Sequence, residues 1–190
     1  MLEINNLSVS INDRYLIKDL SLTLNSGDKL AIIGEEGNGK STLLKVMLGI
    51  CEYAKIEGNI NFRGNSVGYL EQSMSDIYLN QIVHDYLFKD DNEYYNNINN
   101  LYKYLDLINL KDDILKLLVG EYDILFLDEP TNDLDIETLE WLESFINNTN
   151  KPIIYVSHDE TLLSNTANAI LHLEQVKKKT DCRHTYQKID

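Results

Sequence analysis

The stretch Gly34-Glu35-Glu36-Gly37-Asn38-Gly39-Lys40-Ser41 decides the fold. It fits the pattern of a glycine, four variable residues and then Gly-Lys-Ser, which is typical of a loop that holds phosphate groups. Glycines let the backbone aim successive N–H groups inward, and a helix that starts near Lys40 adds the positive end of its dipole. Lys40 supplies a cation for the β- and γ-phosphates, and the Ser41 hydroxyl is a hard oxygen ligand for Mg²⁺. The stretch therefore predicts a site for a nucleoside triphosphate.

The residues on both sides give this loop the setting that it needs. Leu30–Ile33 is an all-apolar run, as expected of a strand buried on both faces of a parallel sheet. Ser41–Gly49 carries leucine and methionine residues at helical spacing, so the pattern predicts strand, loop and helix. Glu35 and Glu36 are unusual neighbours for phosphate. We expect their side chains to point to solvent while their N–H groups bind.

A second acidic motif follows another buried strand. Ile124–Leu127 predicts that strand, and Asp128 and Glu129 come directly after it. Ligands of open α/β sheets bind at this carboxyl edge. Asp128 can hold Mg²⁺ directly or through water, and Glu129 can orient and polarise an attacking water. A strand that ends in Asp-Glu before Pro130 could also simply end at solvent, but the phosphate loop favours the functional interpretation.

Elsewhere the chain predicts strands that alternate with helices. Residues 2–24 predict an antiparallel hairpin, and residues 76–119, which are polar and rich in Asn and Tyr, predict a helical insertion. The other predicted elements are strands at Gly58–Phe62, Val67–Leu70 and Pro152–Val156, helices at Ile136–Asn147 and Glu160–Thr166, and a last strand at Ala169–Leu173. Gly64-Asn65 turns between the first two of these strands. This order predicts an α/β domain with a largely parallel sheet covered on both faces.

Length and composition fit one globular domain. The chain has 190 residues, of which 43% are hydrophobic and 25% charged, and no apolar stretch approaches the roughly 18 residues that span a bilayer. Cys51 and Cys182 fit free thiols in a reducing cytoplasm, and the N-terminus does not resemble a secretory signal. The net charge of -14 disfavours general nucleic-acid binding. Basic residues nevertheless gather in the last fifteen residues, as a solvated tail or as the start of a linker that touches nucleic acid.

The order of motifs resembles that of the nucleotide-binding domains of ATP-binding-cassette (ABC) proteins over nearly the whole chain. Gly34–Ser41 is similar to their Walker A motif, and Gln72 resembles the Q-loop glutamine that senses Mg²⁺ and water. Leu125–Glu129 resembles Walker B with its catalytic glutamate. Asn132-Asp133-Leu134-Asp135 resembles the D-loop, and Ser157-His158-Asp159 resembles the segment with the switch histidine, which contacts the γ-phosphate.

This resemblance implies an α/β fold of the P-loop NTPase class, with an N-terminal antiparallel β-subdomain and a small helical subdomain at 76–119. It implies a single ABC domain over 1–190 that uses ATP and Mg²⁺ and hydrolyses ATP to ADP and phosphate. The implied catalytic residues are Lys40, Gln72, Glu129 and His158, the nucleotide-binding residues are Gly34, Glu35, Glu36, Gly37, Asn38, Gly39, Lys40, Ser41 and Thr42, and the metal ligands are Ser41, Gln72 and Asp128.

The stretch Asp128–Asp135 is most similar to the ABC-F subgroup, which usually has His where Asp133 stands. Those proteins are soluble, lack membrane domains and act on the ribosome in translation or antibiotic protection. Residues 174–190 resemble the start of the linker that leaves a first ABC-F domain. The implied partners are a second ABC domain, placed head to tail, and the ribosome, without direct membrane insertion. The alternative is the ATPase subunit of a membrane transporter.

Two departures from the family pattern bear on function. The signature loop, LSGGQ or a variant, is absent near 113–114, through either an omitted segment or a deletion. In the family that loop clamps the γ-phosphate of the opposite subunit, so a nucleotide-dependent binding module with little activity of its own is a further alternative. The aromatic residue that stacks on adenine in the family falls near Ile11. Ile11 or Tyr15 is expected to cover the base.

Overall fold

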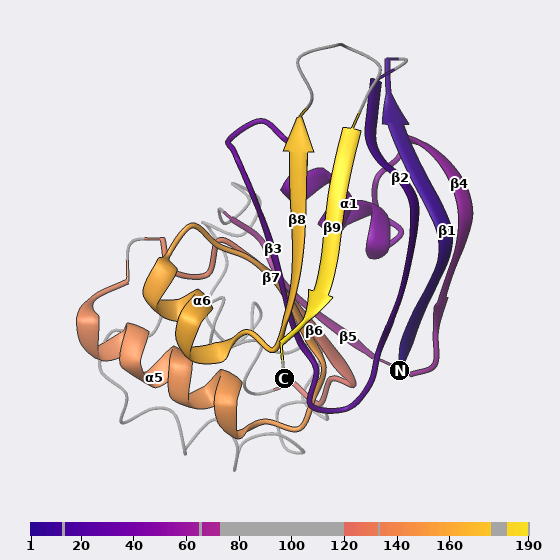
Figure 1. The fold of residues 1–190 in the computed structure, drawn as a ribbon. Coiled ribbons are helices and arrows are strands. Elements are labelled where there is room, and N and C mark those ends of the chain that lie inside the picture. The colour runs from indigo at the N-terminus through magenta and orange to yellow at the C-terminus, as the bar shows by residue number, and fades with distance from the viewer. Residues whose placement is uncertain (13, 65, 73–119, 133, 176–181, 190) are drawn as a thin grey trace, which may run out of the picture.

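A six-stranded sheet forms the centre of the molecule, and a three-stranded antiparallel sheet packs beside it (Figure 1). The computed structural model describes all residues except 13, 65, 73–119, 133, 176–181 and 190. The described elements in chain order are β1 (Leu2–Ile11), β2 (Arg14–Leu24), β3 (Lys29–Gly34), α1 (Lys40–Met47), β4 (Lys55–Phe62), β5 (Val67–Leu70), β6 (Ile124–Asp128), α5 (Ile136–Asn148), β7 (Ile153–Val156), α6 (Glu160–Thr166), β8 (Ala169–Gln175) and β9 (Cys182–Lys188).

The large sheet has the strand order β5-β6-β7-β3-β8-β9, and its first five strands run parallel. β3 lies inside it, with Ala31 opposite Tyr155 of β7 and Ile170 of β8. Leu30, Ala31 and Ile32 are fully buried, because both faces of this strand are covered. The all-apolar run before the phosphate loop is therefore a central strand, as its sequence predicts.

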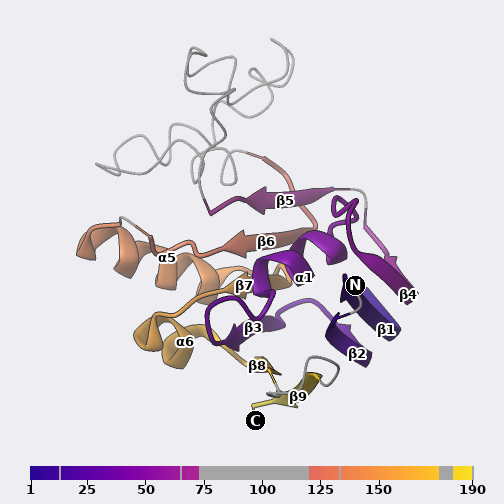
Figure 2. The same ribbon diagram turned by 90° about the horizontal axis from the view of Figure 1, so that it is seen from above.

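Two layers cover the large sheet (Figure 2). Helix α1 and the antiparallel sheet lie on one side, and α5 and α6 lie on the other. Alternate residues of β6 serve the two sides, since Phe126 packs in the core with α1 and Leu127 in the core with α5. The α/β class and the mostly parallel sheet agree with the prediction.

The antiparallel sheet has the order β2-β1-β4. β1 and β2 form the predicted hairpin, with Leu2 opposite Leu24. The two strands predicted on either side of Gly64-Asn65 are both present, but they belong to different sheets. β4 pairs with β1, placing Phe62 opposite Leu2, whereas β5 pairs with β6.

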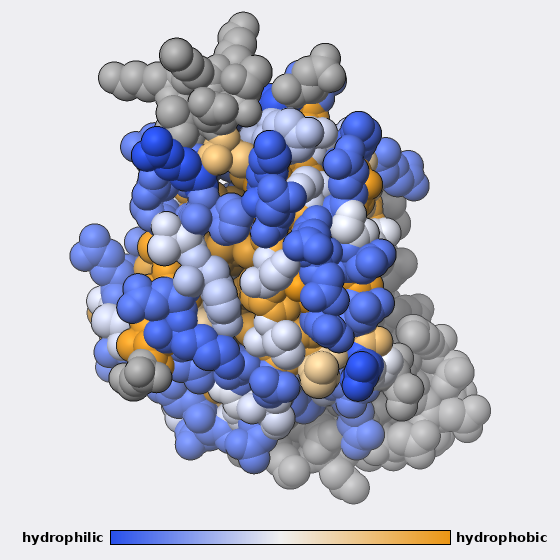
Figure 3. Space-filling model, turned by 45° about the vertical axis from the view of Figure 1, so that its right-hand side comes forward, coloured by the Kyte–Doolittle hydropathy of each residue, from blue (hydrophilic) through white to orange (hydrophobic). Residues whose placement is uncertain are grey.

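The strand predicted at Ala169–Leu173 is present, but it is not the last one, because the sheet continues beyond it. β8 runs to Gln175, and β9 then pairs antiparallel with it along the edge of the sheet. β9 alternates half-buried and exposed residues and is polar, since only one of its faces meets the core. Lys188 at its end forms an ion pair with Asp28 at 2.9 Å. Residues 174–190, expected to begin a linker, thus include a strand of this domain, on the largely hydrophilic side seen in Figure 3.

The predicted helical subdomain at 76–119 and the expected position of the signature loop near 113–114 lie outside the described residues. Among the helices that are described, none has both the length and the apolar character needed to cross a membrane.

Candidate functional site

The phosphate loop connects β3 to α1 at the carboxyl edge of the sheet, and β8 holds it in place. The side-chain amide of Asn38 is buried and donates a hydrogen bond to the carbonyl oxygen of Leu173 at 3.0 Å. Gly34 lies directly opposite Leu173 in the parallel register. A Cβ at Gly34 would come within 2.5 Å of that same carbonyl oxygen, so only glycine fits there. The loop is therefore anchored to β8 at both Gly34 and Asn38.

Lys40 begins helix α1, and its side chain reaches back across the loop. Its ammonium donates hydrogen bonds to the carbonyl oxygens of Gly34 at 3.0 Å and Glu35 at 3.2 Å. The residue is buried, so the loop carbonyls supply the polar contacts that water would otherwise provide. A phosphate oxygen is a stronger partner for an ammonium than a neutral carbonyl. The ammonium is thus held at the phosphate loop by two carbonyl oxygens, which a phosphate oxygen can replace.

Ser41 and Asp128 meet at the side of the loop. The Ser41 hydroxyl donates a hydrogen bond to Asp128 Oδ1 at 2.8 Å, which joins the start of α1 to the end of β6. Burial raises the pKa of the Asp128 carboxyl, while the hydrogen bond from Ser41 and the charges of Lys45 and Lys40 lower it. A hydroxyl and a carboxylate side by side are the oxygen ligands that Mg²⁺ prefers. These residues thus fit the metal role predicted for them, with Gln72 lining the same site.

Glu129 and His158 follow the ends of two neighbouring parallel strands. The Glu129 N–H donates to the carbonyl oxygen of Val156 at 2.9 Å, and the backbone of Glu129 has a φ of 50°. The carboxylate is 9% exposed, and its Oε1 lies 3.3 Å from His158 Nε2. The imidazole is 55% exposed and faces the open site. A confined carboxylate beside an accessible imidazole can orient a water molecule next to a bound phosphate.

One open hollow of about 1090 Å³ brings these groups together. The phosphate loop apart from Asn38 lines it, together with Thr42, Gln72, Glu129 and His158. Asn38, whose amide is hydrogen-bonded to β8, and Asp128 are not among its lining residues. Glu35 and Glu36 are exposed on its rim, as expected from the sequence. A further lining residue, His172 on β8, was missed by the motif analysis. Its one sequence clue is a place near the carboxyl end of a predicted strand, where ligands of parallel sheets gather.

Ile11 and Tyr15, expected at the base, are not among the residues that line this hollow. They lie at the tip of the β1–β2 hairpin, where Ser10 pairs with Tyr15 and Ile11 with Arg14. The ammonium of Lys18 lies 5.6 Å from the centre of the Tyr15 ring. A base contact from either residue stays a prediction.

A model of the ABC transporter family matches residues 17–115. The chain belongs to this family. The expected D-loop of this ABC domain leads into α5, where the Asp135 carboxylate accepts a hydrogen bond from the N–H of Thr138 at 2.9 Å and caps the helix. Asp133, where the ABC-F subgroup has His, lies outside the described residues.

Curated relatives of this ABC domain include members of the F group, which confirms the resemblance to ABC-F. The ATP-binding protein Uup of Buchnera aphidicola is 31% identical over 93% of the chain, and the ribosome protection protein VmlR of Bacillus subtilis is 30% identical over 90%. An ABC transporter F family member of Arabidopsis thaliana is 28% identical over 92%. The alignments cover 33%, 34% and 28% of these relatives, so the chain spans about a third of their length.

Solved structures share the fold of this ABC domain. An ATP-binding subunit of an ABC transporter superposes with a TM-score of 0.74 at 18% identity. The superposition covers 90% of this chain and 85% of the subunit. A putative metal-chelate type ABC transporter in an inward-facing conformation gives a TM-score of 0.72 at 20% identity, over 100% of this chain and 97% of its own. The class of P-loop NTPase predicted from the motifs is thereby confirmed.

Proposed function

We propose that this ABC domain binds ATP with Mg²⁺ and hydrolyses it to ADP and phosphate. The observation that carries the proposal is the convergence of Lys40, Glu129 and His158 on one hollow beside the phosphate loop. These residues come from three separate elements, and the parallel sheet brings them to a single edge.

Phosphoryl transfer to water needs little covalent chemistry from the protein, so positioning and charge stabilisation account for most of the catalysis. The N–H groups of the loop and the Lys40 ammonium would hold the β- and γ-phosphates. Glu129 would orient the attacking water, and His158, already in contact with Glu129, would contact the γ-phosphate. Ser41, Asp128 and Gln72 would hold Mg²⁺, which neutralises part of the phosphate charge when bound.

The variant Glu129→Gln tests the proposal. It keeps the size of the side chain but cannot accept a proton, so we expect phosphate release to fall at least about 100-fold while ATP affinity stays within about twofold. Glu140→Gln is the matched control, because Glu140 is exposed on α5 away from the hollow. Phosphate release and calorimetric ATP titration measure both quantities. Normal turnover by Glu129→Gln would show that the assigned role is wrong.

We further propose that the chain works as one of a pair of ABC domains, head to tail, in a ribosome-associated ABC-F factor of the cytoplasm. The relative named as a ribosome protection protein supports a ribosomal partner, in translation or antibiotic protection. Sedimentation of the full-length protein with ribosomes tests this role. Co-purification with an integral membrane protein instead would favour the alternative, the ATPase subunit of a transporter.

The absence of an LSGGQ motif from the sequence near 113–114 favours a second candidate function. In this candidate the chain is a nucleotide-dependent binding module with little activity of its own. In that case the isolated chain binds ATP and releases phosphate very slowly. Rapid turnover by the isolated chain would rule this candidate out.

A further inference from the structure

The hydroxyl group of Tyr69 on β5 is a buried polar group to which none of the motifs assigns a role. Its oxygen atom is inaccessible to solvent and makes no hydrogen bond with the part of the chain that the structure describes. A buried hydroxyl costs free energy unless a partner satisfies it, so such groups are bonded to protein or to ordered water. The surroundings of Tyr69 therefore indicate which partner it has.

The pairing of β5 with β6 places Tyr69 next to the acidic end of β6. In the parallel register Tyr69 lies opposite Phe126, and Asp128 follows two residues later on the same face of β6. Parallel strands lie about 4.8 Å apart and rise about 3.3 Å per residue, so this offset separates the Cα atoms of Tyr69 and Asp128 by about 8 Å. A side chain as long as that of tyrosine spans most of this distance.

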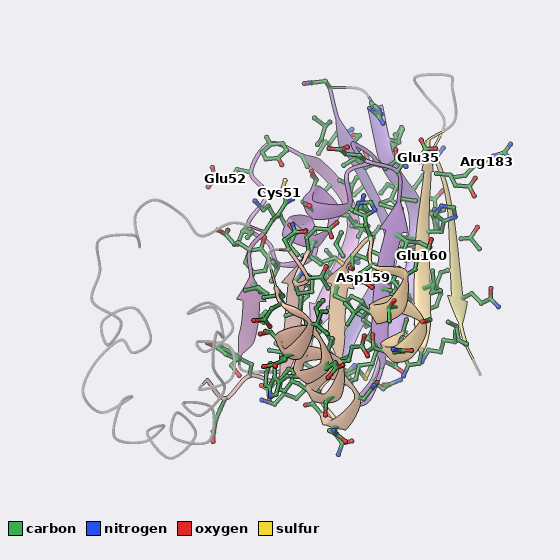
Figure 4. All side chains as sticks on the ribbon, turned by 90° about the vertical axis from the view of Figure 1, so that its left-hand side faces the viewer. Glu35, Cys51, Glu52, Asp159, Glu160 and Arg183 are labelled. Atoms are coloured by element: carbon green, nitrogen blue, oxygen red, sulfur yellow. The ribbon has the colours of Figure 1, made fainter. Side chains whose placement is uncertain are left out.

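Tyr69 faces the layer that contains α1. Its ring packs against the core cluster that includes Phe126 and the buried leucines of α1. Figure 4 shows Cys51, another residue of this core, beside α1. Helix α1 also carries Ser41, whose hydroxyl donates a hydrogen bond to Asp128 Oδ1 at 2.8 Å. Tyr69 and the two oxygen ligands predicted for Mg²⁺ thus share one side of the sheet.

Two carboxylates act on the Tyr69 hydroxyl. Burial raises the pKa of Tyr69, and the negative charges of Asp128 and Glu71 raise it further. The phenol therefore keeps its proton and is a neutral hydrogen-bond donor. A donor close to negative charge is satisfied by a carboxylate oxygen or by a water molecule that the carboxylate holds.

Asp128 offers the acceptor for such a water. Ser41 donates to Oδ1, and in the described part of the chain no hydrogen bond reaches Oδ2. Buried water typically makes about three hydrogen bonds to polar groups that would otherwise lack a partner. One water between the phenol and Oδ2 satisfies both groups. With Ser41 on one oxygen and this water on the other, the carboxylate is held in a single orientation.

We propose that Tyr69 is a positioning residue of the magnesium site, which holds the Asp128 carboxylate through one bound water. The inference rests on the proposed Mg·ATP site. Tyr69 is not among the residues that line the hollow, so it acts through Asp128 and not on the nucleotide. Hydrogen bonds that orient ligand groups raise the affinity for a metal ion, because the ligands are already in place when it binds. Tyr69 thus strengthens the metal-dependent part of nucleotide binding.

Calorimetric titration with the non-hydrolysable ATP analogue AMP-PNP, in excess Mg²⁺ and in EDTA, tests the inference on wild type and Tyr69→Phe. The ratio of the two affinities measures what the metal ion adds. Tyr69→Phe keeps the ring and removes only the hydroxyl, so we expect this ratio to fall about tenfold, the low end of the range for residues that orient metal ligands. The affinity in EDTA should stay within about twofold of wild type, because metal-free nucleotide does not need the oriented carboxylate.

Tyr186→Phe is the matched control, because the Tyr186 hydroxyl is also buried and makes no hydrogen bond with the described residues. Tyr186 lies on β9 opposite Leu171, and its charged neighbours are Lys188 and Asp28, at the other edge of the sheet. We expect its affinity ratio to equal that of wild type. The control separates the loss of a buried hydroxyl in general from the loss of the one beside Asp128.

An affinity ratio in Tyr69→Phe equal to that of wild type would overturn the inference while leaving nucleotide binding intact. Equal losses in Mg²⁺ and in EDTA would overturn it as well, because a residue that only supports the fold weakens binding in both conditions. If wild type binds AMP-PNP in neither condition, the proposed function itself is wrong. Wild type that binds AMP-PNP but gains nothing from Mg²⁺ would refute the metal site and with it the role of Tyr69.

Discussion

Replacing Gly34 by alanine adds a single methyl group at the point where the phosphate loop meets β8. The new Cβ would come within 2.5 Å of the Leu173 carbonyl oxygen, a main-chain atom inside the sheet that cannot swing aside. The φ of +149° at Gly34 adds a backbone conformation that alanine disfavours, at a cost of about 1–3 kcal/mol. If the loop moves away, the hydrogen bond from Asn38 to Leu173 is lost as well, which costs about 0.5–1.5 kcal/mol.

We therefore expect Gly34→Ala to lower the free energy of unfolding by roughly 1.5–4.5 kcal/mol, the sum of these two effects. The loop N–H groups also move, so nucleotide affinity should fall even where the variant is fully folded. Urea unfolding followed by the fluorescence of Trp141 measures the first quantity, and titration calorimetry at low temperature measures the second.

Gly49→Ala is the control that isolates the cost of placing alanine at a positive φ. Gly49 also has a positive φ, +74°, but a Cβ there meets no atom within 4 Å. We expect a loss of about 1–2 kcal/mol and unchanged nucleotide affinity. Equal losses of stability in the two variants, together with normal nucleotide binding by Gly34→Ala, would refute the reasoning from the contact with β8.

Two further predictions concern buried polar groups. The hydroxyl of the fully buried Tyr155 lies 2.7 Å from Thr166 Oγ1, and the Thr166 hydroxyl donates its own proton to the carbonyl oxygen of Leu162, so the phenol is the donor between them. Tyr155→Phe removes this donor and should lower the free energy of unfolding in urea by only about 1 kcal/mol. Thr166→Val leaves the buried phenol without an acceptor and should lower it by about 1–3 kcal/mol. Burial lowers the pKa of Lys29 to about 8, although the neighbouring Asp28 raises it. Between pH 8 and 10.5 the unfolded chain then binds more protons at this site than the folded one, so the stability of wild type relative to Lys29→Met should rise from pH 7.5 to pH 10.

Each of these two predictions has an outcome that contradicts it. A larger loss in Tyr155→Phe than in Thr166→Val would mean that the phenol does not act as the donor. A stability difference between wild type and Lys29→Met that stays constant or shrinks as the pH rises would show that the Lys29 ammonium is not desolvated in the folded state.

The phosphate loop and the strands that precede it and the Asp128-Glu129 pair could be predicted because their information is local. Leu30–Ile33 shows by its unbroken apolar run that both faces are buried, and the spacing from Gly34 to Ser41 describes a loop whose backbone does the binding. Asp128 and Glu129 follow another such run, so their place at the carboxyl edge also follows from the chain itself.

Strand partners and contacts between distant segments could not be predicted in this way. β4 and β5 are only a short turn apart, yet one joins β1 and the other β6, because the register depends on residues far away in the sequence. β9 was missed since a polar edge strand needs only one buried face. The proximity of His172 to the phosphate loop depends on the pairing of β8 with β3, and no local pattern encodes that pairing.

The position of β3 within the sheet has a consequence for the order of folding. Both of its neighbours, β7 and β8, come from the far end of the chain, so the strand that leads into the phosphate loop has no sheet partner until most of the domain has been synthesised. Long-range pairings of this kind close late and slow the folding reaction, because the entropy of a large loop is lost before any contact forms. Until then, the nascent chain carries Leu30–Ile33 as a bare apolar segment that needs protection from aggregation.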